Sequence, residues 1–269
     1  MSIPQSVILG IIQGIAEWLP ISSSGHLVIA QEFFGLQNST FFDIMLHIAT
    51  TMVVFAVFWN DIKEIIKALF KRDFKSEYGK LAIFIIIGSI PTGIIGILFH
   101  DTFEKMFSNL WAVALGLMIT GILLFFTKRK TIEAGDSPAK TKELNTKKSL
   151  LIGVVQGIAI IPGISRSGST ISAGILAGVD RIKVARFSFL LSIPAILGAL
   201  LLEAGKLKNL ATNNTNSASI LIGMVIAIII GYISLKLLLK IIKLDKFYLF
   251  GYYCIILSFI LLNILIFVK

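Results

Sequence analysis

Six long apolar stretches are the feature of this sequence that most limits its fold. A helix needs about 20 mostly apolar residues to cross the hydrocarbon core of a bilayer. Because that core offers no water to backbone groups, such spans must be helical. The sequence therefore predicts an all-α polytopic membrane protein with six transmembrane helices. These are expected at residues 41–59, 81–99, 111–127, 184–203, 219–238 and 247–268.

The composition supports this class. Hydrophobic residues make up 56% of the 269 residues and charged residues 15%, whereas soluble domains are about 45–50% apolar and about 25% charged. A soluble enzyme, a disordered chain and a secreted disulfide scaffold are therefore excluded. The single cysteine, Cys254, excludes an internal disulfide and a thiolate metal cluster. The net charge of +10 lies mostly in short loops, so we expect contact with membrane lipids and no nucleic-acid partner.

The distribution of Lys and Arg predicts the orientation of the spans. Twenty of the 25 basic residues lie in four segments. By the positive-inside rule these segments face the cytoplasm. Six alternating spans then leave both chain ends on the extracytoplasmic side. The four segments are residues 60–80, 128–149, 180–186 and 236–246.

Two further apolar segments, residues 6–35 and 149–178, are interrupted. Each reads as a short helix, a break rich in Pro, Gly and Ser, and a second short helix. The predicted topology places both ends of each segment on one side of the membrane, so each is expected to be a re-entrant helix-loop-helix hairpin. Irregular backbone at membrane depth is tolerated where protein or a cavity surrounds it. The two hairpins would enter from opposite faces and meet near the midplane.

The two hairpins are also related in sequence. With an offset of 143 residues they align without gaps, so that Gly10 and Gln13 fall on Gly153 and Gln156. Because they enter from opposite sides, we interpret the chain as an inverted-topology repeat, which places a site at the repeat interface. The expected organisation is a single integral membrane domain over 1–269, with repeat 1 at about 1–127, a basic cytoplasmic linker at about 128–148 and repeat 2 at about 149–269.

The first hairpin carries a carboxylate at the predicted membrane depth. Gln13 and Glu17 are four residues apart, which puts both on one helical face. A carboxylate at the bilayer centre costs about 2.5–3.5 kcal/mol on insertion scales, so it needs a partner or a function. Glu17 beside the Gln13 amide oxygen suits a hard cation such as Mg²⁺ or Ca²⁺. The alternative is a structural hydrogen bond between helices.

Three hydroxyls and a histidine follow the point where Pro20 ends the first helix. The sequence there places Ser22, Ser23 and Ser24 just before His26. A serine close to a histidine is a candidate nucleophile with an acid–base partner. Serine clusters also cap helices, but this cluster coincides with the break of the hairpin.

The second hairpin offers donors for an anion. Arg166 stands at its break, and a guanidinium binds phosphate through two parallel donors. The half-helix that follows would direct its N-terminal N–H groups at the same point. The alternative for Arg166 is a cation that reaches to the membrane surface. The hydroxyls expected to help bind phosphate are Ser22 and Ser24 in the first hairpin and Ser165, Ser167, Ser169 and Thr170 in the second.

Together the two hairpins would set a metal and a base against a phosphate cradle. Phosphoryl transfer needs mainly positioning and charge stabilisation, which these groups can provide. The sequence leaves three nucleophiles open, namely Ser23, His26 and a metal-bound water. The residues expected to take part in catalysis are Glu17, Ser23, His26 and Arg166.

The remaining polar residues of the spans receive structural interpretations. His47 and His100 are expected to be span-interior or interfacial residues rather than ligands. Asp43 and Arg186 occupy matching positions in the two repeats, and each is expected to anchor the end of a span. Trp18 is expected to line the site.

Three motifs closely resemble those of the bacterial undecaprenyl-diphosphatase family, the bacitracin-resistance phosphatases of cell-wall lipid recycling. They are QGIAE at 13–17, LPISSSGH at 19–26 and PGISRSGST at 162–170. The resemblance covers the whole chain in length and span pattern. It implies removal of the terminal phosphate of undecaprenyl diphosphate, a divalent cation, and a site reached from the extracytoplasmic side of the bacterial plasma membrane.

The resemblance also implies a role in recycling the lipid carrier of peptidoglycan synthesis. The alternative is a secondary transporter or flippase for a phosphorylated prenyl lipid, because transporters contain inverted repeats with broken helices. Transport alone does not need the Glu17, Ser23 and His26 set, which favours the enzyme. A homodimer and a preference for one prenyl length are left open.

Overall fold

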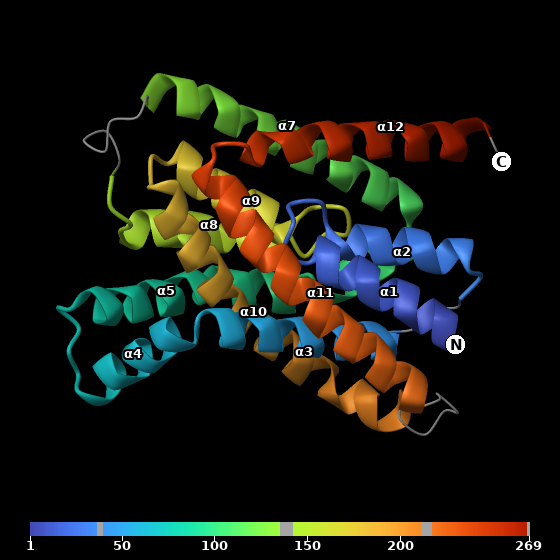
Figure 1. Cartoon of the computed structure of the whole chain (residues 1–269), viewed down its shortest axis with the longest axis horizontal. Helices are drawn as coiled ribbons and strands as arrows, with labels where there is room; N and C mark the ends of the chain where they lie inside the picture. The colour runs from blue at the N-terminus through green and yellow to red at the C-terminus, as the bar shows by residue number, and fades with distance from the viewer. Residues whose placement is uncertain (37–39, 135–141, 211–216, 268–269) are drawn as a thin grey trace.

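The computed structural model describes residues 1–36, 40–134, 142–210 and 217–267, and the regular structure of this part of the chain is helical (Figure 1). Lys142 and Val179 form an isolated β-bridge. The all-α prediction is confirmed. The helices are α1 (Ile3–Ala16), α2 (Ser23–Phe33), α3 (Thr40–Val57), α4 (Trp59–Phe70), α5 (Glu77–Leu98), α6 (His100–Met106), α7 (Leu110–Ala134), α8 (Thr146–Ile158), α9 (Arg166–Leu176), α10 (Arg181–Leu210), α11 (Ser217–Lys243) and α12 (Phe250–Phe267), with a 3-10 turn, η2 (Phe247–Leu249), before α12.

Five of the described helices are long and apolar enough to cross a membrane. They are α5, α7, α10, α11 and α12. Helices α3 and α4 form a pair that passes the same test together, and the chain bends by 79° between them. The number of candidate spans rises to six if that pair is counted as one. The protein is therefore a multi-pass membrane protein.

Two helices extend beyond the apolar stretches that predicted them. Helix α7 continues to Ala134 instead of ending near residue 127, and α10 continues to Leu210 instead of ending near residue 203. The added residues include four Lys, two Leu and two Ala. These residues have high helix propensity, so a helix can continue where its apolar stretch stops.

Both interrupted segments form two short helices around a break. Ser22 caps α2 and Ser165 caps α9, and each hydroxyl accepts a hydrogen bond from the N–H of the glycine three residues later. Ser22 has a φ of 69°, a left-handed conformation that is uncommon for a residue with a side chain. In the other break Gly163 has a φ of 89°, and a Cβ there would collide with the carbonyl of Val113 on α7.

Each of the two leading short helices packs on a long helix from the other half of the chain. Helix α1 lies against α11, and α8 lies against α5. A Cβ on Gly10 would collide with the Gly223 carbonyl, and a Cβ on Gly153 would collide with the Gly88 carbonyl. Small residues at such crossings let helix backbones approach closely in membranes. The position of each break therefore depends on a glycine contact between the two halves.

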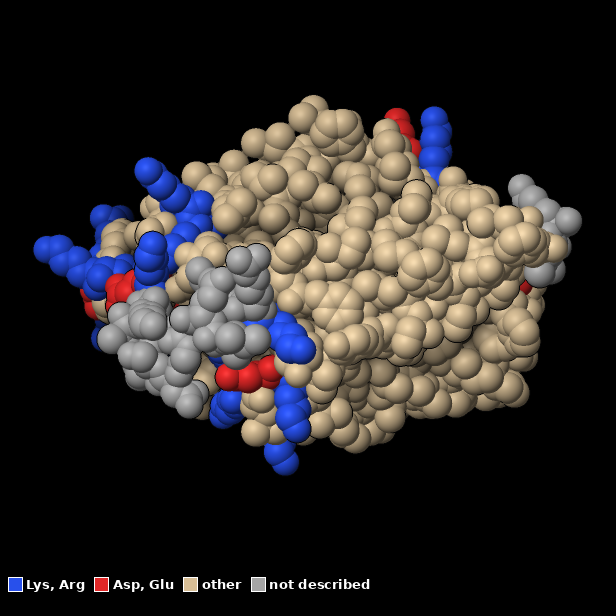
Figure 2. Space-filling view, turned by 90° about the horizontal axis from the view of Figure 1, so that it is seen from above, with Lys and Arg blue, Asp and Glu red and all other residues tan. Residues whose placement is uncertain are grey.

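The charged side chains gather at one end of the molecule. Most of the Lys and Arg side chains visible in Figure 2 lie at its left, while both chain ends lie at the opposite side of the molecule (Figure 1). At the basic end Arg186 pairs with Asp61 on α4 and donates a 2.8 Å hydrogen bond to Glu77 on α5. Asp43, its counterpart in the first half, accepts a 2.7 Å hydrogen bond from Gln31 on α2.

The glycine crossing of α8 and α5 predicts a difference between two glycine substitutions. Gly153→Ala should lower stability by about 1–3 kcal/mol because its methyl group collides with backbone. Gly93→Ala on α5 should be neutral or stabilising by up to about 1 kcal/mol, since no neighbouring atom lies within 4 Å of the place its Cβ would take. Thermal unfolding in detergent measures both. Equal melting temperatures for the two variants would contradict the close approach.

Candidate active site

The two breaks touch each other. A Cβ on Gly25 would lie 3.2 Å from Gly163 Cα, and a Cβ on Gly168 would lie 3.1 Å from Pro20 Cβ. Each of these distances is shorter than an ordinary van der Waals contact, so the missing side chains let the breaks meet directly. The residues that begin α2 and α9 are thereby brought into one place.

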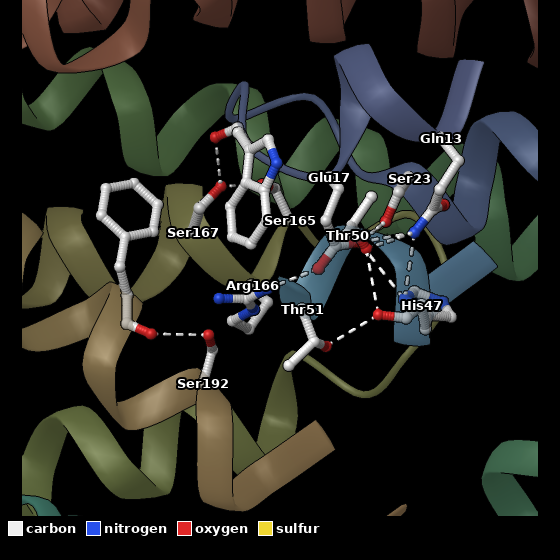
Figure 3. Close-up of polar contacts among 12 residues, drawn as sticks. Gln13, Glu17, Ser23, His47, Thr50, Thr51, Ser165, Arg166, Ser167 and Ser192 are labelled. Atoms are coloured by element: carbon white, nitrogen blue, oxygen red, sulfur yellow. Dashed lines mark hydrogen bonds and ion pairs between the residues drawn. The ribbon is translucent and has the colours of Figure 1, made fainter. Parts of the chain in front are cut away.

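Glu17 lies at the centre of the polar contacts, at the point where α1 ends. Its side chain is almost fully buried, with 7% of the residue exposed. Ser23 Oγ donates a 2.7 Å hydrogen bond to Oε2, and Gln13 Nε2 donates one of 3.1 Å to the same oxygen. Arg166 Nη2 lies 2.5 Å from Oε1. Figure 3 shows Ser23, Gln13 and Arg166 arranged around this carboxylate.

Arg166 is the first residue of α9 and uses only part of its guanidinium within the protein. Nη2 pairs with Glu17, and the guanidinium carbon lies 5.7 Å from the ring centre of Trp18. Nη1 is buried and has no hydrogen-bond partner among the described residues. A buried donor without an acceptor costs about 1–3 kcal/mol or more when charged. Arg166 therefore presents a free donor beside the Glu17 carboxylate, where an anion can bind.

Ser23 and His26, the two candidate nucleophiles of the first segment, lie in different environments. Ser23 is bonded to Glu17 as described above. His26 Nδ1 lies 2.8 Å from the Ser22 carbonyl oxygen, and Nε2 lies 2.7 Å from the Tyr253 hydroxyl on α12. Both ring nitrogens of His26 are thus engaged by partners other than Ser23. The carboxylate, and not the imidazole, is placed to take the Ser23 proton.

Most of the hydroxyls predicted to bind phosphate are already hydrogen-bonded to other described residues, and one of them, Ser169, is not. Ser22 and Ser165 cap α2 and α9, with Ser24 and Ser167 hydrogen-bonded to them at 3.2 and 3.3 Å. Ser167 and Thr170 also donate to backbone carbonyls, those of Trp18 at 3.0 Å and Arg166 at 2.7 Å. Ser169 Oγ is buried with no partner in the described part of the chain. The contacts of Ser167 and Thr170 hold the loop and the first turn of α9, so these two position Arg166.

Sequence reasoning missed two polar residues on α3. His47 Nδ1 lies 3.1 Å from Gln13 Nε2 and 3.4 Å from Glu17 Oε2, and Thr50 Oγ1 accepts from Gln13 Nε2 at 3.4 Å. The interpretation of His47 as purely structural is therefore incomplete. The available signal was the spacing of three residues between His47 and Thr50, which puts both on one face of a helix.

The family comparison supports the motif resemblance. The family model described as Bacitracin resistance protein BacA matches residues 6–260. The chain belongs to this family. Among its relatives, a protein of Methanosphaera stadtmanae is 40% identical over 97% of each chain. One of Halothermothrix orenii is 44% identical over 94% of this chain and 95% of the relative, and one of Korarchaeum cryptofilum is 38% identical over 98% and 100%. All three relatives are named undecaprenyl-diphosphatase.

The site of this BacA-family protein contains oxygen ligands that fit a hard divalent cation. Gln13 is fully buried, its Nε2 donates to Glu17, and its Oε1 has no partner among the described residues. A free amide oxygen beside a carboxylate is the donor type that Mg²⁺ and Ca²⁺ use. Glu17 is the only carboxylate in these contacts. A cation here would take its other ligands from phosphate oxygens and water, as Mg²⁺ commonly does.

The buried Glu17–Arg166 pair predicts an unequal effect of removing one or both charges. Glu17→Gln keeps the side-chain size but leaves the guanidinium uncompensated, and breaking a buried pair in this way costs about 3–5 kcal/mol. The double variant Glu17→Gln/Arg166→Gln should recover part of that loss. Thermal unfolding of the purified variants measures the difference.

Glu64→Gln is the matched control for this test, because Glu64 forms an ion pair of 2.6 Å with Lys67 at an exposed position. Its melting temperature should stay close to that of the wild type, since exposed pairs contribute little. A double variant no more stable than Glu17→Gln alone would show that the two charges do not depend on each other.

Proposed function

We propose that this protein hydrolyses undecaprenyl diphosphate to undecaprenyl phosphate and inorganic phosphate. The observation that carries this proposal is the free Nη1 of Arg166 beside the Glu17–Ser23 pair. An anion donor, a base and a hydroxyl nucleophile converge there, and these groups are sufficient for phosphoryl transfer. The names of the relatives support the substrate. They give no support to a transporter or flippase.

The geometry favours Ser23 as the nucleophile. Its Oγ would form a bond to the terminal phosphorus as the bond from that phosphorus to the bridging oxygen breaks. The bond's electron pair leaves with undecaprenyl phosphate, and the Ser23 proton passes to Glu17, 2.7 Å away. Arg166 holds the oxygens on which negative charge develops. Water then attacks the phosphorus of the phosphoserine as the bond from that phosphorus to Ser23 Oγ breaks. The proton held by Glu17 returns to Oγ, and inorganic phosphate leaves with both protons of the water.

His26 is a weaker candidate nucleophile than Ser23. Its Nδ1 and Nε2 are both in hydrogen bonds, with the Ser22 carbonyl and the Tyr253 hydroxyl. Attack through Nε2 would require the Tyr253 contact to break first, whereas Ser23 already bonds to its base. Direct attack by water remains the competing route, and trapping of a phosphoenzyme separates it from the Ser23 route.

The divalent cation is part of this proposal. Glu17 and Gln13 would hold it, through the carboxylate and the buried amide oxygen Oε1. When bound, Mg²⁺ or Ca²⁺ supplies positive charge to the diphosphate oxygens. The two α3 residues near Gln13, His47 and Thr50, keep its amide nitrogen turned toward them, so that Oε1 is the atom left free.

The proposed architecture is two re-entrant hairpins in an inverted repeat, with repeat 1 at about 1–127, repeat 2 at about 149–269 and a basic linker between them. Reciprocal contacts support it. Gly25 meets Gly163 and Gly168 meets Pro20, and each partner lies 143 residues from its counterpart in the other contact. Contacts exchanged in this way are expected at a two-fold axis.

The proposed location is a plasma membrane, with the site open to the extracytoplasmic side and both chain ends on that side. The basic end of the molecule would face the cytoplasm, and both chain ends lie at the opposite side (Figures 1 and 2). In bacteria the reaction would recycle the lipid carrier for peptidoglycan synthesis. Faster removal of the diphosphate would also account for the bacitracin resistance in the family's description.

Phosphate release by the purified protein in detergent tests the proposal. Wild-type protein should release phosphate from undecaprenyl diphosphate, and chelation of divalent cations should stop the reaction until Mg²⁺ or Ca²⁺ is restored. Glu17→Ala and Arg166→Ala should each lower the rate by about 10²–10³-fold or more. The rate of Arg166→Lys should lie between those of the wild type and Arg166→Ala, because lysine keeps the positive charge but lacks the paired donors of the guanidinium.

Glu64→Gln, an exposed variant, should keep the wild-type rate and serves as the control for that assay. Each inactive variant must retain the wild-type elution profile in detergent, so that the loss is not due to unfolding. A wild-type protein that releases no phosphate with either cation would refute the proposed function.

A phosphoenzyme should accumulate if Ser23 is the nucleophile. Rapid acid quench after mixing with substrate labelled in the terminal phosphate should leave label on the protein, and peptide mapping should place it on Ser23. Ser23→Ala should carry none, while Ser24→Ala should still be labelled because its hydroxyl contacts Ser22 and not Glu17. Turnover without any labelled protein would favour direct attack by water.

A further inference from the structure

His26 is held from two sides by groups of different chemistry. Its Nδ1 lies 2.8 Å from the backbone carbonyl oxygen of Ser22, which can only accept, so Nδ1 carries a hydrogen. In the neutral ring Nε2 then has a lone pair, and the Tyr253 hydroxyl at 2.7 Å donates to it. The two rings are nearly parallel, with an interplanar angle of 12° and centres 5.6 Å apart.

Tyr253 reaches this ring from the far end of the sequence. It lies on α12, and its side chain is exposed on one side, with 45% of the residue accessible. The adjacent Cys254 directs its Sγ to the Pro20 carbonyl oxygen at 3.5 Å. Two consecutive residues of α12 therefore contact the first hairpin. Cys254 contacts the backbone of its break, and Tyr253 contacts the imidazole of His26.

The contact also fixes where the imidazole stands relative to the nucleophile. His26 and Ser23 are three residues apart in the first turn of α2, so they lie on the same face of that helix. A phosphoryl group on Ser23 would therefore lie on the imidazole's side of the helix. Small errors in the placement of such a group can cost large factors in rate.

We propose that Tyr253 is a positioning residue for the phosphatase reaction, whose hydroxyl fixes the orientation of His26. The inference rests on the function proposed above. With the hydroxyl present, His26 is a neutral ring with hydrogen on Nδ1 and Nε2 as its acceptor. Without it, the ring keeps its bond to Ser22 but Nε2 loses its donor and the ring loses one of its two anchors.

Nitrogen NMR of the full-length protein in detergent, labelled with ¹⁵N-histidine, tests the contact without any activity. The chain has three histidines, and His47→Gln and His100→Gln variants assign the signals. The wild type should show the Nδ1–H tautomer for His26. Tyr253→Phe, which keeps the ring and removes the hydroxyl, should shift the His26 Nε2 signal and leave His100 unchanged.

Tyr252→Phe is the matched control, because the Tyr252 ring packs edge-on against Phe125 at 4.7 Å and lies on the same helix. It should leave the His26 signals and the rate unchanged. A His26 spectrum that is identical in Tyr253→Phe and the wild type would overturn the proposal, whatever the phosphatase assay shows.

Kinetics test the consequence of the contact. Loss of one hydrogen bond to the imidazole should lower kcat of Tyr253→Phe by about fivefold to tenfold, with KM changed by less than about twofold. In a His26→Gln background the same substitution should cause no further loss, because Tyr253 acts only through His26. A rise in KM alone, or an undiminished loss in that background, would contradict the positioning role.

The two parts of the experiment fail separately. If the wild type releases no phosphate, the proposed function is wrong and the kinetic arm falls with it. The NMR arm still decides whether the Tyr253 hydroxyl donates to Nε2 of His26. If the wild type is active and Tyr253→Phe alters neither the spectrum nor kcat, only the present inference is wrong.

Discussion

The ion pair between Glu17 and Arg166 is the interaction on which the arrangement of the site depends. The two residues are 149 positions apart in the sequence, and each lies beside a helix break. Neither charge is tolerable alone in an apolar interior, because an unpaired buried charge costs several kcal/mol. Each break therefore supplies the opposite charge that compensates the buried charge of the other break. The glycine contacts at Gly25 and Gly168 allow the backbones to approach closely enough for the pair to form.

In the proposed mechanism the same pair would link substrate binding to catalysis. Arg166 divides its guanidinium between Glu17 and the unpartnered Nη1. A phosphate bound there would share the positive charge that now stabilises the carboxylate. Glu17 would then be a better acceptor for the Ser23 proton than it is without substrate. A site built on a protein ion pair thus keeps its base satisfied until an anion enters, without leaving a buried carboxylate unpaired.

Local patterns in the sequence predicted most of the elements, whereas contacts between residues far apart in the sequence could not be predicted. Apolar length located the five candidate spans and the bent pair α3–α4, and Pro20 and the glycines located the breaks. The offset between the segments brought Glu17 and Arg166 into one hypothesis. His47 could not be found in that way, because its role depends on where α3 packs. Tyr253 was missed for the same reason, since no short-range pattern links α12 to α2. The extensions of α7 and α10 were missed because the length of an apolar stretch indicates only the part of a helix that lies within the bilayer.

Equivalent positions in the two breaks carry different side chains, which would let a repeated pair of segments perform an asymmetric reaction. Ser22 and Ser165 each accept a hydrogen bond from the N–H of the glycine three residues later, yet the next residue is Ser23 in one break and Arg166 in the other. This shared hydrogen bond begins each half-helix at the residue that differs, so each break places that residue near the meeting point. In the proposed mechanism a nucleophile then stands on one side and an anion donor on the other. Two copies of either break would give two hydroxyls or two cations there, and neither pair could both hold and attack a phosphate. The proposed chemistry therefore requires that the two segments share the capping contact and differ in the residue that follows it.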